Sequence, residues 1–126
     1  MIIAIGTDIL EISRLEQAIK KNGDSFLQRF LTPEELEHAR TKGAAFSSYC
    51  AGRWAAKEAV AKMLGTGIGK NCSWQDIIIR NQPSGAPEVF LQGAAAETAG
   101  SLGIKRILIS ISHEQHYCTA TVIGTV

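Results

Sequence analysis

The spacing of apolar and polar residues changes several times along the chain, and each change predicts a new helix or strand. Strands are predicted where apolar residues run together or alternate with polar ones, over residues 2–9, 74–80, 87–91, 106–112 and 117–124. Turn-forming residues separate the second strand from the third and the fourth from the fifth, which predicts two antiparallel hairpins. The first strand is expected to break at Gly6 and to carry Asp8 on the face that holds Ile2 and Ala4.

Apolar residues at helical spacing predict helices over residues 14–23, 24–31, 33–42, 46–64 and 93–103. Two capping boxes are expected, one formed by Ser13 with Glu16 and one by Thr32 with Glu35. Helices and antiparallel strands follow one another in mixed order, without repeats or linkers. This order predicts a single α+β domain of residues 1–126, in which an antiparallel sheet packs against the long helix and the shorter ones.

The composition is that of a globular domain and argues against two classes of protein. Hydrophobic residues make up 45% of the chain, and no apolar run approaches the roughly 18 residues that a membrane span needs. A net charge of +1, with two Trp and two Tyr, provides neither a broad basic surface nor stacking platforms for nucleic acid. The chain starts with apolar residues and meets Asp8 early, without the basic segment of a signal peptide, so we expect a cytoplasmic protein. Its three cysteines lack metal-binding spacing and are expected to be reduced, buried thiols.

Glu58 and Lys62 lie one helical turn apart at the end of the longest predicted helix, directly before the glycine-rich stretch 65–69. An acid four residues before a lysine is a common surface ion pair, which stabilises a helix by only about 0.3 to 0.5 kcal/mol. Gly65 by itself is an ordinary helix C-cap. Arg53, however, places charge on the apolar side of the same helix, which favours a second interpretation in which these cations and the loop amides hold a phosphate. The spacing alone leaves both interpretations open.

Asp8 is unusual because it interrupts an apolar strand. It could cap the following helix or pair with a buried arginine. Together with Glu58 it could instead bind Mg²⁺, a hard ion that usually takes one or two protein carboxylates and completes its shell with water and phosphate oxygens. His113 ends a strand, where binding groups often gather, although a single histidine in a hairpin turn is more often structural.

In their order and spacing, these segments resemble the holo-[acyl-carrier-protein] synthase family, the short bacterial class of phosphopantetheinyl transferase. The stretches that carry the resemblance are "IGTDILEISRLE" (5–16), "AGRWAAKEAVAKMLGTGIG" (51–69), "SWQDI" (73–77), "GAPEV" (85–89) and "ISISHEQHY" (109–117). They extend over nearly the whole chain, and together they are more specific than any single motif.

The resemblance implies the 4′-phosphopantetheinyl transferase fold and a defined reaction. Members of the family transfer the 4′-phosphopantetheine arm of coenzyme A to a serine of an apo acyl carrier protein, for fatty-acid synthesis. They release adenosine 3′,5′-bisphosphate and require Mg²⁺. The resemblance also implies a homotrimer whose active sites lie between neighbouring subunits.

This reaction gives each charged residue of the site a task. By resemblance, Asp8 and Glu58 hold the Mg²⁺, and Lys62 binds the pyrophosphate of coenzyme A. Phosphoryl transfer depends mainly on neutralising charge and on aligning the attacking and leaving groups, which these residue types can provide. Our hypothesis is that Glu58 also acts as general base for the serine hydroxyl, directly or through a metal-held water.

The same resemblance assigns further residues to substrate binding. Those that line the coenzyme A cleft are Lys62, Gly65, Ser112 and His113, and those on the first helix that dock the acidic carrier protein are Arg14, Lys20 and Lys21. This chain has Gly85, Ala86 and Pro87 where the family often has Gly-Lys-Pro. We expect Arg53 to supply the missing cation near the ribose 3′-phosphate.

Two other functions are consistent with parts of the sequence. A non-catalytic module that binds coenzyme A or the carrier protein would use Arg14, the glycine-rich loop and His113, but it would have no use for two converging carboxylates. A purely structural oligomer predicts that Asp8→Ala and Glu58→Ala change stability alone.

Overall fold

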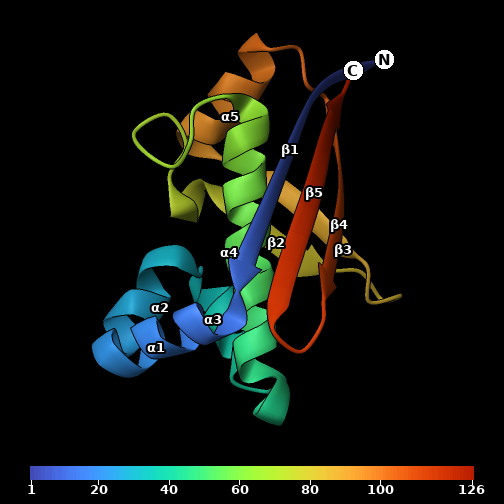
Figure 1. Ribbon diagram of the computed structural model, residues 1–126. Coiled ribbons are helices and arrows are strands. Elements are labelled where there is room, and N and C mark those ends of the chain that lie inside the picture. Colours follow the sequence, from blue (N-terminus) through green and yellow to red (C-terminus); the bar gives the residue numbers. More distant parts are fainter.

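In the computed structural model, which describes residues 1–126, a long helix crosses one face of a three-stranded antiparallel sheet (Figure 1). The helix is α4 (Phe46–Leu64), and the sheet has the strand order β1 (Ile2–Glu11), β5 (Tyr117–Thr125), β4 (Arg106–His113). A second sheet consists of the antiparallel strands β2 (Ile77–Asn81) and β3 (Pro87–Leu91). The other helices are α1 (Ile12–Asn22), α2 (Asp24–Phe30), α3 (Pro33–Ala39) and α5 (Gly93–Ser101), with short 3-10 helices at Gly43–Ala45 and Trp74–Asp76. The predicted α+β class and both predicted hairpins are confirmed.

The three-stranded sheet has one covered and one uncovered face. Asp8 pairs with Ala120, which in turn pairs with Ile111, so these residues form one row on the face that α4 covers. Successive residues of a strand point to opposite faces, so the neighbours of these residues lie on the other face of the sheet. On that outer face, Ile5 and Ile9 of β1 are 63% and 66% exposed. The helices lie on the α4 side of this sheet, so no element of the chain covers its outer face (Figure 1).

β1 runs through Gly6 without interruption, so the prediction of a break there is wrong. Gly6 is buried where β1 meets α4, and a Cβ atom at this position would overlap the carbonyl oxygen of Ala59. The same atom would lie 2.6 Å from the amide nitrogen of Met63. The glycine is therefore required for the close approach of strand and helix, which is a common reason for glycine inside a strand.

The two predicted capping boxes have different outcomes. Thr32 and Glu35 form theirs: the Glu35 amide donates to Thr32 Oγ1 at 3.2 Å, and the Thr32 amide donates to Glu35 Oε1 at 2.8 Å. Ser13 does not cap α1, because that helix already begins at Ile12. The Ser13 hydroxyl donates instead to the Glu11 carboxylate at 2.8 Å.

Several element ends differ from the prediction. α3 ends at Ala39 and not at residue 42. The second predicted strand was expected from residue 74, but β2 begins only at Ile77, because Trp74–Asp76 form a 3-10 turn. In that turn the Ser73 amide donates to the Asp76 carboxylate at 3.3 Å. Local side-chain hydrogen bonds of this kind compete with strand formation.

The core surrounds α4 on most of its circumference. Phe30, Trp54 and Trp74 pack against one another beside it, with ring centroids 5.0 Å apart for the first pair and 4.4 Å apart for the two tryptophans. All three cysteines are buried and unpaired, as predicted. None of the helices combines the length and the hydrophobicity that crossing a membrane requires.

Candidate active site

Two carboxylates and one amine gather where β1 passes α4. Asp8 lies on the covered face of β1, while Glu58 and Lys62 project from the helix. The Lys62 ammonium donates to Asp8 Oδ1 at 3.0 Å, with the lysine side chain 52% exposed and the aspartate side chain 14% exposed. Lys62 thus bonds across the helix–strand junction and not to Glu58. The simple surface pair between Glu58 and Lys62 is not the arrangement that forms.

The charge of Glu58 is poorly accommodated in the folded protein. Partial burial raises the pKa of the Glu58 carboxyl, the nearby Asp8 carboxylate raises it further, and Lys62 lowers it. Repulsion between two partly buried carboxylates is the kind of strain that a bound divalent cation relieves.

The donor set of this site suits a hard cation. No cluster of three or more His, Cys, Asp or Glu side chains with metal-binding geometry occurs in the chain, so Asp8 and Glu58 stand as a pair. Mg²⁺ commonly takes one or two carboxylates from protein and its remaining ligands from water and phosphate oxygens. Zinc sites, in contrast, have three or four protein ligands, among which His and Cys predominate. The residues present therefore fit Mg²⁺ and not Zn²⁺.

Two buried thiols near these carboxylates stay protonated. Burial raises the pKa of Cys72 and of Cys118 to about 11, with an added contribution from Asp76 at the first and from Asp8 at the second. A thiol in this state is a poor nucleophile and a poor metal ligand at neutral pH. The chemistry of the site therefore depends on its carboxylates and its amine.

The glycine-rich loop after α4 begins as a helix cap. Gly65 adopts a left-handed conformation with φ of 79°, and its amide donates to the Lys62 carbonyl at 3.0 Å. The amides of Thr66 and Gly67 both donate to the Ala61 carbonyl at 3.2 Å. These three amides therefore already have acceptors within the helix end.

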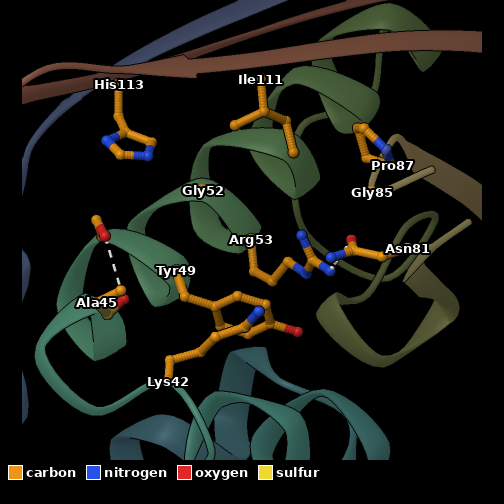
Figure 2. Close-up of a pocket in the computed structure, with 11 residues that line it drawn as sticks. Lys42, Ala45, Tyr49, Gly52, Arg53, Asn81, Gly85, Pro87, Ile111 and His113 are labelled. Atoms are coloured by element: carbon orange, nitrogen blue, oxygen red, sulfur yellow. Dashed lines mark hydrogen bonds between the residues drawn. The ribbon is translucent and has the colours of Figure 1, made fainter. Parts of the chain in front are cut away.

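A concave region opens beside the N-terminal half of α4, as a cavity of about 270 Å³ (Figure 2). Ile111 and His113 point into it from β4, and Tyr49 and Arg53 enter from α4 (Figure 2). The rest of its lining includes Lys42, Asn81, Gly85 and Pro87. The cavity combines cationic groups with one aromatic ring, and the turn that lacks a lysine at position 86 forms part of its wall.

Arg53 is the most constrained cation in this cavity. Its side chain is buried, one terminal nitrogen donates to Asn81 Oδ1 at 2.7 Å, and the guanidinium lies 4.3 Å from the centre of the Tyr49 ring. Its Nε has no hydrogen-bond acceptor. Buried donors are nearly always satisfied, so an unpaired one at a cavity wall indicates a place for a ligand acceptor.

Sequence reasoning missed several residues of this cavity, among them Lys42, Tyr49 and Asn81. A signal existed for Tyr49, because it precedes Arg53 by four residues and therefore shares its helix face. Asn81 had no such signal, since it reaches the cavity through the pairing of β2 with β3 and the packing of that hairpin near β4.

The structure does not bring all the expected site residues together. Ser112 and His113 are consecutive in β4, so their side chains point to opposite faces of the sheet. His113 lines the cavity, while Ser112 lies in the outer-face row that contains Thr119 and Ile9. β5 also separates β1, which carries Asp8, from β4.

The three basic residues expected to dock a carrier protein are all exposed on α1. Arg14 and Lys21 are seven residues apart and lie on the same face of the helix, whereas Lys20 lies roughly a third of a turn away. Lys20 and Lys21 occupy the last turn, where positive charge also stabilises the helix dipole.

Known proteins similar to this chain agree with one another in fold and in name. A family model described as the 4′-phosphopantetheinyl transferase superfamily matches residues 4–122. The chain is 46% identical over 125 residues to the holo-[acyl-carrier-protein] synthase of Vibrio cholerae, which covers 98% of this chain and 97% of that one. The crystal structure of the holo-[acyl-carrier-protein] synthase from Neisseria meningitidis matches over 100% of both chains, with a TM-score of 0.92 and 40% identity. The corresponding Helicobacter pylori protein in complex with coenzyme A matches with a TM-score of 0.84 and 38% identity, over 96% of this chain and 99% of that one.

Proposed function

The chain belongs to the 4′-phosphopantetheinyl transferase superfamily, and from this membership we propose that it acts as a holo-[acyl-carrier-protein] synthase in the cytoplasm. It transfers the 4′-phosphopantetheine group of coenzyme A to a serine of an apo acyl carrier protein and so supports fatty-acid synthesis. The observation that carries this proposal is the convergence of Asp8 and Glu58, from a strand and a helix far apart in the chain, beside Lys62. A module that merely binds coenzyme A has no need for two carboxylates at one place.

The reaction exchanges one bond to phosphorus for another. The serine oxygen attacks the β-phosphorus of coenzyme A, the bond from this phosphorus to the bridging oxygen breaks, and adenosine 3′,5′-bisphosphate leaves. Glu58 accepts the serine proton, directly or through a water. A general base must lie within hydrogen-bond reach of the proton that it accepts, directly or through one water.

Asp8 and Glu58 are the residues that would hold Mg²⁺, which supplies positive charge at the pyrophosphate when it is bound. Lys62 provides a second positive charge for the same group. Its side chain is half exposed, so its ammonium can turn from Asp8 to a phosphate oxygen when the substrate binds. The exposed Gly65 behind it would leave room for the rest of the coenzyme.

The cavity beside Arg53 would take the adenosine bisphosphate end of the coenzyme. Support comes from the unpaired Arg53 Nε and from the cationic and aromatic lining contributed by Lys42, Tyr49 and His113. Arg53 lies close to the turn with Ala86 and would bind the 3′-phosphate there. If Arg53→Gln binds coenzyme A and dephospho-coenzyme A with equal affinity while the wild type prefers coenzyme A, this assignment holds. The absence of any preference in the wild type would contradict it.

We further propose that the protein is a homotrimer with active sites between neighbouring subunits. The exposed apolar side chains on the outer sheet face, such as Ile5, Ile9 and Leu108, suit burial against a second copy. Ser112 lies on this same face, away from the cavity of its own chain, so it would line the coenzyme cleft of a neighbour. This arrangement gives Ser112 and His113 separate tasks.

The exposed basic residues Arg14, Lys20 and Lys21 would dock the acidic carrier protein on α1. Electrostatic contacts of this kind mainly raise the rate of association and weaken with salt. Arg14→Glu should therefore raise the KM for the carrier protein and leave the KM for coenzyme A unchanged.

Mass spectrometry of the carrier protein tests the proposed function directly. Incubation of the protein with apo carrier protein, coenzyme A and Mg²⁺ should add the mass of phosphopantetheine to the carrier protein. The same mixture with EDTA should add none. An unchanged mass in the presence of Mg²⁺ would favour a binding module over a transferase.

A further inference from the structure

Lys57 and Glu35 form an ion pair that solvent does not reach. Lys57 Nζ lies 2.7 Å from Glu35 Oε1, and the two side chains are 0% and 1% exposed. The ammonium also donates to the carbonyl oxygen of Trp74 at 3.1 Å. Every other ion pair of the chain has at least one half-exposed side chain.

Glu35 connects three separate elements through this pair. Its Oε1 accepts the Thr32 amide at 2.8 Å, and its Oε2 accepts the Ile79 amide at 2.8 Å. The carboxylate thus ties the start of α3 to β2, and Lys57 ties both of them to α4.

Stability alone does not require an ion pair at this place. Glu35 uses both oxygens as acceptors, one for the Thr32 amide and one for the Ile79 amide, so Gln could satisfy only one of the two. Removing two charges from water is so unfavourable that a buried ion pair is often no more stable than apolar residues of similar volume. The best-attested use of such a pair is to fix register and orientation.

α4 approaches the sheet closely at two places, where Gly52 lies against Ile111 and where Ala59 lies against Gly6. Ionic hydrogen bonds are directional, so the buried pair adds an orientational constraint to this packing. Lys57 is the residue immediately before Glu58, so a constraint on one side chain also sets the direction of the other.

We propose that the Lys57–Glu35 pair is a positioning device that fixes the rotation of α4 and thereby aims Glu58 at Asp8. The inference rests on the proposed function of Asp8 and Glu58 as metal ligands. Lys57 touches neither the substrate nor the metal and acts through its neighbour. Small changes in the position of the Glu58 carboxylate matter, because a displacement of about 1 Å can lower a rate by about 100-fold.

The double variant Glu35→Gln/Lys57→Met tests this role, because it removes both charges and keeps one oxygen for the Thr32 amide, although the Ile79 amide loses its acceptor and some stability is lost with it. The variant should fold, and its apparent Mg²⁺ affinity should fall by about 10- to 100-fold, the range seen when groups behind metal ligands are changed. Its kcat should fall while its KM for coenzyme A stays unchanged. Mg²⁺ affinity is read from the rise of the melting temperature with Mg²⁺ in the presence of coenzyme A, and kcat from the mass-shift assay.

The matched control is Glu34→Gln/Arg80→Gln. It removes an exposed ion pair of 3.0 Å that also joins α3 to β2. Glu34 is next to Glu35 in the sequence and Arg80 is next to Ile79, so the control lies beside the buried hydrogen bond between Glu35 and Ile79. This control should have the apparent Mg²⁺ affinity and the kcat of the wild type.

Wild-type Mg²⁺ affinity and kcat in Glu35→Gln/Lys57→Met would overturn the inference. If that variant does not fold, Glu35→Asp takes its place, since it keeps both charges and moves the carboxylate by one methylene. Its Mg²⁺ affinity and its kcat should fall in the same way, and wild-type values of both would overturn the proposal. A failure of the proposed function shows differently, as a wild type that leaves the carrier protein unmodified. The Mg²⁺ titration of the melting temperature then still decides whether the pair positions Glu58.

Discussion

At the scale of single residues, the site holds charged groups in places where they weaken the fold. Glu58 is partly buried next to another carboxylate, and Arg53 is buried with an unpaired Nε. Both features are unfavourable in an isolated chain, and both are resolved by ligands that carry the opposite charge or a free acceptor. Residues that are chosen for function commonly violate the rules of stability in this way.

Glu58→Gln is expected to stabilise the metal-free protein. Burial and Asp8 raise the pKa of Glu58 above its ordinary value of 4.5, so the folded state binds this proton more tightly than the unfolded state does. Stability from this group is therefore lost as the pH rises above that value. In EDTA, calorimetry should give Glu58→Gln a higher melting temperature than the wild type at pH 7, and the difference should shrink toward pH 4. The exposed Glu97→Gln serves as control, and a Glu58→Gln variant that is less stable than the wild type at pH 7 would contradict the electrostatic interpretation.

The three cysteines should resist thiol reagents until the protein unfolds. Burial raises the pKa of Cys50 to about 12 and that of Cys72 and Cys118 to about 11, so almost no thiolate exists at pH 8. Release of thionitrobenzoate from Ellman's reagent should follow the urea unfolding curve. Reaction of any thiol in the absence of urea would show that the burial described here is wrong. Because thiol pKa values are raised in the folded state, stability should also fall as the pH rises above 9.

At the scale of elements, the contact between β1 and α4 brings the two carboxylates together. Gly6 and Ala59 let the strand and the helix approach closely. Gly6 precedes Asp8 by two residues in β1, and Ala59 directly follows Glu58 in α4. The active-site geometry thus depends on the absence of side chains near it.

Gly6→Ala should therefore destabilise the protein strongly. The added methyl group would overlap backbone atoms of α4, which cannot move aside as a flexible side chain does. Overpacking of this kind costs about 1 to 3 kcal/mol, measured as the free energy of unfolding in urea. Gly100→Ala is the matched control, because a Cβ at this helical position meets nothing within 4 Å and Ala is the better helix former. Equal stability of the two variants would contradict the close packing.

The local signals in the sequence predicted the elements better than the contacts between them. Gly65 marks the end of α4 as its left-handed cap, and Thr32, Pro33 and Glu35 define the start of α3 through local hydrogen bonds. Gly6 gave the wrong signal, because glycine marks both chain breaks and close approaches, and only the position of α4 distinguishes them. The pairing of Asp8 with Glu58 came from the chemistry of Mg²⁺ and from the resemblance. Asn81 in the cavity depends on how two sheets pack, which no local pattern encodes.

At the scale of the whole molecule, the outer sheet face is the main feature that a single chain leaves unexplained. It exposes Ile5, Ile9 and Leu108 in a continuous sheet, and it carries Ser112. Cover by neighbouring subunits would explain both the apolar surface and the position of the serine.

Ile5→Lys should separate the subunits without unfolding them, because this side chain is 63% exposed in the isolated chain. Sedimentation should give a trimer for the wild type and a monomer for the variant, and the variant should lose transferase activity at the same protein concentration. Leu102→Lys changes a similarly exposed apolar residue away from this sheet and should remain trimeric and active. A wild type that sediments as a monomer and is fully active would contradict the shared active site.

If Asp8 and Glu58 together bind the Mg²⁺ on which transfer depends, changing either carboxylate must change how carrier-protein modification responds to Mg²⁺. Rates are measured by mass for the wild type, Asp8→Asn and Glu58→Gln at saturating coenzyme A. Each variant should be slower by about 100- to 1,000-fold, the loss typical of a stabiliser of transition-state charge, and should need more Mg²⁺ for half-maximal rate. Variants that keep the wild-type rate and the wild-type Mg²⁺ midpoint would contradict the account.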